Sequence, residues 1–284
     1  MQRVAIVTDS IACLTREQIA RYGIEIIPVN FYACGKLYRD LVDITPSEAY
    51  ELFLKEPESF KSSAASPEDC LQAYRSASQR AKNILCITVS SELSMMCNAA
   101  QDAKELAKAE LPEISIEVMD SQTATPSEGF IVLAAARAAA VGKDMAEVLG
   151  AAEDVKNRVN TIVFLDTIRH VYRSGRIPKI ASQIGSMLNI KPILTISGKV
   201  HFTAAVRNRK HGIERILQMM REKVGQSPVH VSVLHAYALD EAEKLKERVA
   251  SEFDCTEMWI AEFSPVMGYA CGTGTVGVAF YTED

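Results

Sequence analysis

Short apolar runs alternate with longer amphipathic segments through the first half of the chain. This alternation is typical of parallel strands connected by crossover helices. The predicted strands cover residues 4–8, 24–29, 84–88 and 114–119, and the predicted helices cover residues 15–22, 46–54, 67–81, 93–109, 127–141 and 145–158. Pro46 and Pro67 stand directly after Thr45 and Ser66, so we expect two helices with first-turn prolines and hydroxyl caps.

The pattern changes near residue 160, where the apolar segment TIVFLDT begins. Two strands joined at Ser197-Gly198 are expected in the segment 190–209, because a Ser-Gly pair between apolar runs favours an antiparallel hairpin. Further strands are expected at residues 229–235, 257–263 and 276–281, with helices at 208–224 and 240–253. We therefore predict a two-domain α/β protein: a Rossmann-like N-terminal domain with a parallel sheet (1–160) and a C-terminal α/β domain with a mixed sheet (161–284).

Three predicted strands end in hydroxyl-rich turns. The first turn contains Asp9 and Ser10, the second is SSELS at residues 90–94, and the third contains Asp120 and Ser121. In an open parallel sheet such turns gather at the carboxyl edge, where ligands usually bind. Two interpretations stay open: the serines cap helices, or the Asp-Ser turns form the site of an enzyme that acts on a small molecule.

Composition and charge exclude several classes of protein. The chain of 284 residues is 48% hydrophobic, which is enough for a core in each domain. Its formal net charge of -5 gives no electrostatic reason to bind nucleic acid. The N-terminal apolar run is too short for a signal peptide, and no run is long enough to span a bilayer. We expect a cytoplasmic protein without a transmembrane segment.

The glycine motif GTGTVG matches the spacing of a dinucleotide-binding fingerprint through Gly272, Gly274 and Gly277. That fingerprint needs a helix after the glycines, whose amide groups face the pyrophosphate. Only seven residues follow Gly277, and they predict a strand. We therefore expect these glycines to allow a tight turn or a close backbone approach.

The cysteines and histidines show no spacing that is typical of a metal site. The seven cysteines lie at least eleven residues apart, and the five histidines form no HExxH pattern. No metal and no cofactor is therefore expected. Arg173 and Arg176 form a basic cluster, for which contact with an anion or partner and a solvated turn are equally good interpretations.

Six segments appear in a fixed order along the chain: VAIVTDS, KSSAASPED, SSELS, VMDS, SGRIPKIASQIGSMLNIKPIL and PVMGYACGTGTVGVAF. In this order they resemble the DegV family of bacterial fatty-acid-binding proteins over essentially the whole chain. The resemblance implies a two-domain α/β protein that holds one long-chain fatty acid, with a buried tail and a carboxylate bound by hydroxyls. It also implies a carrier without catalysis of its own, which presents its ligand to an ATP-binding fatty acid kinase subunit for acyl phosphate formation.

The resemblance also assigns candidate ligand-binding residues. Ser62 and Ser63 match the hydroxyl pair that is a first carboxylate ligand in the family, and Ser94 matches the second. Near the C-terminus, the segment GYACGTG stands where the family usually has the pattern G-x-H-x-G-P-G. Gly268 matches the first glycine of that pattern, and Ala270 stands at the position of the histidine. The alanine suggests an alternative function, a lipid buffer or sensor that has lost its kinase partner.

Met95 and Met96 follow Ser94, where the family usually has glycine and threonine. Methionine is flexible and suits an irregular apolar cavity, so either residue could close over the first part of a lipid tail. The alternative is that both methionines fill the core between helix and sheet. Ser94 itself would combine a neutral hydroxyl donor with the positive end of a helix, which suits a carboxylate.

Overall fold

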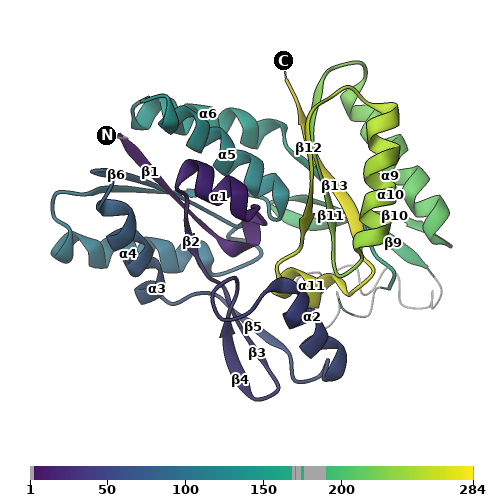
Figure 1. Cartoon of the computed structure of the whole chain (residues 1–284), viewed down its shortest axis with the longest axis horizontal. Coiled ribbons are helices and arrows are strands. Elements are labelled where there is room, and N and C mark those ends of the chain that lie inside the picture. Colours follow the sequence, from purple (N-terminus) through teal and green to yellow (C-terminus); the bar gives the residue numbers. More distant parts are fainter. Residues whose placement is uncertain (1–2, 168–169, 171–173, 176–189, 284) are drawn as a thin grey trace.

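The N-terminal part of the chain forms the predicted parallel sheet (Figure 1). The structure is a computed structural model that describes residues 3–167, 170, 174–175 and 190–283. Four parallel strands lie in the order β2-β1-β6-β7, with bounds β1 (Val4–Asp9), β2 (Glu25–Ile27), β6 (Asn83–Thr88) and β7 (Ser115–Asp120). The Rossmann-like fold expected for this part is therefore confirmed.

Helices cover both faces of this sheet because its strands are apolar on both faces. Val4 and Ile6 face one layer of helices, and Ala5 and Val7 face the other. The first layer contains α1 (Arg16–Tyr22), α5 (Pro126–Ala140) and α6 (Met145–Arg158), and the second contains α3 (Pro67–Ser78) and α4 (Met96–Glu110). The sheet thus has two separate apolar cores.

The helix starts follow the local sequence signals. Thr45 caps α2 (Pro46–Lys55) and Ser66 caps α3, each through a reciprocal capping box with the third helical residue. Both expected caps and both first-turn prolines are therefore confirmed. The start of α4 differs from the prediction, because the helix begins at Met96 and not at Leu93.

The second sheet has six strands and is mixed, as predicted. Its order is β10-β9-β8-β13-β11-β12, and only β11 and β12 pair in parallel. The strand bounds are β8 (Asn160–Phe164), β9 (Lys191–Ser197), β10 (Lys199–Val206), β11 (Val229–His235), β12 (Cys255–Glu262) and β13 (Val276–Thr282). The hairpin expected at Ser197-Gly198 joins β9 to β10, with Gly198 at a positive φ of 64°.

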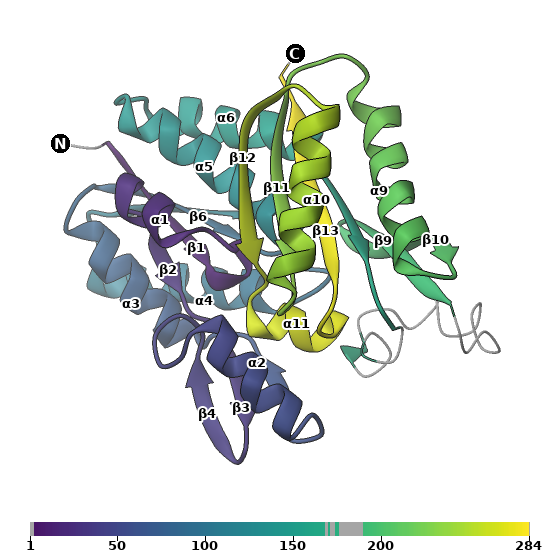
Figure 2. The ribbon, with the colours of Figure 1, turned by 45° about the vertical axis from the view of Figure 1, so that its right-hand side comes forward.

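Two layers of helices enclose this sheet. On one face lie α9 (Arg209–Val224) and α10 (Leu239–Glu252), and Figure 2 shows α10 beside β11 and β13 and α9 on the side of β9 and β10. The other face shares an apolar core with α5, because Val163, Leu234 and Ala279 cluster with residues of that helix. Helix α5 is buried on nearly all sides between the two sheets, which explains why it is apolar around its whole circumference.

A third, smaller sheet was not predicted from the sequence. Strands β3 (Asn30–Ala33), β4 (Lys36–Arg39) and β5 (Lys61–Ser63) are antiparallel in the order β4-β3-β5 and pack with α2. We call residues 30–63 the small subdomain. Its core consists of aromatic rings, with the centroids of Phe31 and Phe60 4.8 Å apart. The short helix α11 (Pro265–Cys271) was also missed, and its Tyr269 stacks on Phe60 at 5.1 Å.

The glycines of the motif near the C-terminus allow backbone conformations and contacts that a side chain would prevent, as expected. Gly272 and Gly274 have positive φ angles of 87° and 83°, in the connection between α11 and β13. A Cβ at Gly277 would collide with the carbonyl oxygen of Ile162 on the neighbouring strand. The predicted turn and close backbone approach are both confirmed.

Two negative findings apply to the described part of the chain. No group of three or more His, Cys, Asp or Glu side chains there is arranged to hold a metal ion. None of its helices combines the length and the apolar character that a membrane crossing requires.

Candidate functional site: an apolar cavity with serine hydroxyls

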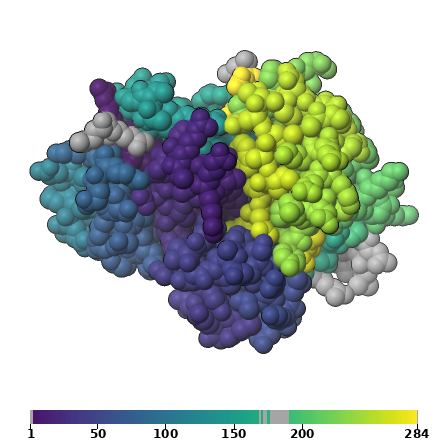
Figure 3. All heavy atoms as spheres, in the orientation of Figure 1, coloured from purple at the N-terminus to yellow at the C-terminus, as the bar shows by residue number. Residues whose placement is uncertain are grey.

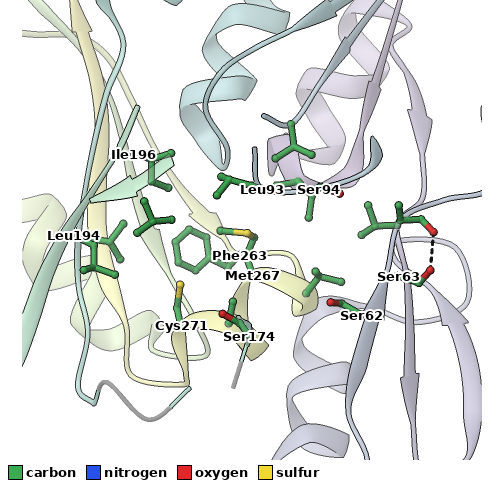
Figure 4. Close-up of a pocket in the computed structure, with 18 residues that line it drawn as sticks. Ser62, Ser63, Leu93, Ser94, Ser174, Leu194, Ile196, Phe263, Met267 and Cys271 are labelled. Atoms are coloured by element: carbon green, nitrogen blue, oxygen red, sulfur yellow. Dashed lines mark hydrogen bonds between the residues drawn. The ribbon is translucent and has the colours of Figure 1, made fainter. Parts of the chain in front are cut away.

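A cavity lies where the parallel sheet, the small subdomain and the six-stranded sheet meet (Figure 4). Its empty volume is about 860 Å³, part of which is open to solvent. Among the described residues its lining is mainly apolar, contributed by Ile11, Val29, Ala64, Val89, Leu93, Val163, Leu194, Ile196, Val200, Phe263, Val266, Met267, Ala270 and Cys271. The polar lining consists of four serines, Ser62, Ser63, Ser94 and Ser174.

The serines of the lining do not all lie on one side of the cavity, because Ser174 lies beside Cys271. Ser62 and Ser63 lie on the side of the small subdomain, and Leu194 and Ile196 lie on the side of the six-stranded sheet. No charged side chain of the described chain lines it. Such a cavity suits a ligand with a long apolar part and one small polar group.

Ser62 and Ser63 lie on β5, which is an edge strand of the small sheet. The Ser63 hydroxyl donates a hydrogen bond to the Ala64 carbonyl oxygen at 3.0 Å. Because a hydroxyl rotates freely about its C–O bond, this donor can turn toward a ligand at the cost of one local hydrogen bond.

Ser94 belongs to the turn between β6 and α4. The Ser94 Oγ accepts a hydrogen bond of 3.3 Å from the Met96 amide, which is the first of the helix. The hydroxyl hydrogen can therefore be donated to a ligand, close to the positive end of the α4 dipole. Of the other serines in this turn, Ser90 donates to the Gly198 carbonyl oxygen at 2.6 Å and Ser91 donates to Asp120 at 2.5 Å.

The two methionines after Ser94 have different environments. Met95 is 63% exposed, and Met96 is fully buried in the core between α3 and α4. The Met96 sulfur accepts a hydrogen bond of 3.1 Å from the Ala65 amide, next to the lining residue Ala64. Neither methionine is among the described lining residues of the cavity, so Met96 supports the wall from behind.

Of the two candidates near the C-terminus, one lines the cavity and the other does not. Ala270 lines the cavity, whereas Gly268 faces α2, where an added Cβ would collide with the Tyr50 ring. Arg173 and Arg176 lie outside the described residues. The structure thus brings Ser62, Ser63, Ser94 and Ala270 together around one cavity.

The Asp-Ser turns gather at the carboxyl edge of the parallel sheet, as predicted, but their polar groups are used internally. Asp9 is fully buried and accepts hydrogen bonds of 2.9 Å from the amides of Ile11 and Val89. Burial raises the pKa of Asp9 to about 7, although both amide bonds oppose the rise. The Ser10 Oγ accepts the Val29 amide at 3.2 Å. Since Ile11, Val29 and Val89 all line the cavity, this turn shapes its wall.

The β9–β10 hairpin covers the edge beside the other two turns. Its tip residue Gly198 donates its amide to the Gln122 carbonyl oxygen at 2.5 Å and accepts the Ser90 hydroxyl. The Asp120 carboxylate accepts hydrogen bonds from Ser91 and from the Gln122 amide. Contacts between the two sheets therefore use several polar groups of these turns, and the hairpin and the turns line a second, open cleft.

Sequence reasoning missed several lining residues. Ser174 lies in a segment where we selected only the two arginines as candidates, and Phe263 directly follows β12, whose apolar residues predict a core. Met267 lies on the unpredicted helix α11. Because an apolar residue that lines a cavity has the same sequence pattern as one in a packed core, no sequence signal could have identified Phe263 or Met267.

Comparison with known proteins agrees with this architecture. A sequence model described as "Uncharacterised protein, DegV family" matches residues 3–283, so the chain belongs to the DegV family. A DegV domain-containing protein of Clostridium perfringens is 30% identical over 99% of each chain. The structure of a DegV family protein from Thermus thermophilus, which is described as showing fatty acid binding, has a TM-score of 0.90 and 28% sequence identity. The match covers 99% of this chain and 100% of the Thermus thermophilus chain. DegV from Bacillus subtilis, described as a fatty acid binding protein, has 25% identity and a TM-score of 0.89 over the whole of both chains.

Proposed function

We propose that this protein binds one long-chain fatty acid, with its carboxylate at Ser62, Ser63 and Ser94 and its tail in the apolar part of the cavity. The observation that carries the proposal is the cavity itself, which is lined by apolar side chains and, among the described polar ones, only by serines. The two DegV relatives described as fatty acid binding proteins support the same ligand class.

The tail and the head group make different demands on the cavity. Each methylene that leaves water contributes about 0.8 kcal/mol, so a long tail supplies ample binding free energy. A carboxylate without partners is costly to bury. Serine hydroxyls and the start of α4 provide neutral donors and a partial positive charge, which lower that cost without a buried cation.

The proposed role is that of a carrier without chemistry of its own. The Asp-Ser turns, which favour the alternative of a small-molecule enzyme, have Asp9 and Ser121 buried and Asp120 hydrogen-bonded within the protein. In this proposal residues 1–160 and 161–284 are the two domains between which the lipid lies. An ATP-binding fatty acid kinase subunit is the proposed partner, and a lipid buffer or sensor without that partner is the alternative that Ala270 suggests.

Native mass spectrometry of the protein purified from cells tests this function, combined with lipid extraction after denaturation. We expect one fatty acid per chain, and the extract identifies its length and unsaturation. A protein that purifies empty and also takes up no added fatty acid would contradict the proposal. Copurification with a kinase subunit would separate the carrier from the buffer or sensor.

Ser94→Ala is expected to weaken fatty-acid binding by about tenfold or more, because a hydrogen bond to a charged group contributes about 1.5–3 kcal/mol. Ser91→Ala is the matched control, since Ser91 lies in the same turn but donates to Asp120. Titration calorimetry with one fatty acid compares the two variants with the wild-type protein. Equal affinities for wild type and Ser94→Ala would remove Ser94 from the head-group site.

A further inference from the structure

The corner between β12 and α11 is tied to the small subdomain, against which the C-terminal part of the chain packs (Figure 3). Glu262, Phe263 and Ser264 are consecutive at this corner, and each forms one hydrogen bond with a side chain of the segment 40–50. We call these bonds the clasp: Ser47 Oγ donates to Glu262 Oε2 at 3.1 Å, Tyr50 Oη donates to the Phe263 carbonyl oxygen at 3.1 Å, and Ser264 Oγ donates to Asp40 Oδ2 at 2.7 Å.

Two of the three hydrogen bonds are buried, and these two fix the position of the corner relative to the small subdomain. Tyr50 and Asp40 are 1% and 0% exposed, whereas the bond between Ser47 and Glu262 is exposed to solvent. A buried polar group that loses its partner is costly, but an exposed one exchanges its partner for water. The ring of Tyr50 also lies so close to Gly268 that no Cβ fits between α2 and α11.

The clasp joins two parts of the cavity wall without entering the cavity. On one side of it, the small subdomain carries Ser62 and Ser63. On the other side, Phe263 and helix α11 line the apolar part. Neither Tyr50 nor Asp40 is among the described lining residues, so both act on the cavity only through the corner and the helix that they hold.

We propose that Tyr50 and Asp40 are positioning residues that set the length of acyl chain accepted by the cavity. They do so by fixing α11 relative to the serines of β5, and the inference rests on the proposed fatty-acid-binding function. Each methylene that is gained or lost from the cavity changes the affinity by about fourfold. A small displacement of α11 therefore changes the preference between acids of different length.

The test compares Tyr50→Phe with Tyr74→Phe. The Tyr74 hydroxyl donates to the Ala100 carbonyl oxygen at 3.0 Å in the buried contact between α3 and α4, away from the described cavity lining. Both variants lose one buried hydroxyl-to-carbonyl hydrogen bond and keep the ring, so we expect similar decreases in thermal stability. Only Tyr50→Phe is expected to change the ratio of affinities for myristate and stearate, by about fourfold or more.

Hydrogen–deuterium exchange of the α11 amides provides a second readout that needs no ligand. Faster exchange in residues 265–271 of Tyr50→Phe, with no change in Tyr74→Phe, is the expected result. An unchanged myristate-to-stearate ratio in a Tyr50→Phe protein that binds both acids would overturn the proposal, as would an equal change in Tyr74→Phe. If the wild-type protein itself bound neither acid, the proposed function would fail first, and exchange in α11 would still decide whether the clasp holds the helix.

Discussion

Ala270→Phe is expected to reduce fatty-acid affinity by a factor on the order of hundreds and to leave the fold intact. Ala270 lines the cavity and is only half-buried, so an added phenyl ring enters space that the ligand would use. If the ring excludes four or five methylenes at about 0.8 kcal/mol each, the loss is roughly 3–4 kcal/mol. A ring placed in a packed core would instead strain the structure.

Ala250→Phe serves as the control for this substitution. Ala250 is exposed on α10 and lies outside the described cavity lining, so the same added ring should not affect binding. Displacement of a fluorescent fatty acid measures the affinity, and thermal unfolding shows that both variants are folded. Lipid extracted from Ala270→Phe in equimolar amount, with the wild-type chain length, would show that the tail lies elsewhere.

The sequence was sufficient to predict the two large sheets, because strands such as β1, β6 and β11 are apolar runs and helices such as α3 and α6 carry explicit start signals. β11 has the predicted bounds, and α6 was predicted residue for residue. Local hydrogen bonds determine where these elements begin. The cap of α3, for example, is formed by Ser66 and Asp69, which lie at the start of the same helix. Boundaries failed where the cap is unusual, as at Met95, whose side chain makes no capping hydrogen bond to α4.

The small subdomain and α11 could not be predicted, because tertiary contacts stabilise them more than local preferences do. β5 has three residues, KSS, without an apolar alternation. α11 contains Gly268, which disfavours a helix but is needed for the close contact with Tyr50. These elements depend on aromatic contacts such as that between Phe60 and Tyr269, which are distant in sequence.

Only part of the candidate site could be predicted from the sequence. Among the residues that the family resemblance selected, Ser62 and Ser63 of β5, Ser94 of the turn before α4 and Ala270 of α11 line one cavity. For Met96 the pattern allowed a core position or a cavity position, because both are apolar, and only its place against Ala65 separates them. That these residues bind a lipid stays a prediction.

Asp40→Asn is expected to change how the free energy of unfolding depends on pH. Burial raises the pKa of Asp40 from 3.8 to about 6, although hydrogen bonds from the hydroxyls of Ser264 and Ser10 oppose the rise. Between about pH 4 and pH 6 the folded protein therefore binds more protons than the unfolded chain. Its stability falls as the pH rises through this window, and the loss levels off above the folded pKa.

The expected size of this effect is on the order of 3 kcal/mol, because one pKa unit corresponds to about 1.36 kcal/mol. An asparagine can still accept the Ser264 hydrogen bond but cannot ionise, so wild type should lose that amount relative to Asp40→Asn between pH 4 and pH 7. Urea unfolding at several pH values measures the difference.

Asp43→Asn provides a control with the opposite sign in the same segment of chain. The Arg39 guanidinium and amide, which hydrogen-bond to Asp43, lower the pKa of that carboxyl to about 2. Its contribution is therefore present above about pH 4 and is lost as the pH falls toward 2. Parallel pH profiles for wild type and Asp40→Asn would show that the Asp40 carboxyl is not held in the buried clasp, because burial at this position is the main cause of its raised pKa.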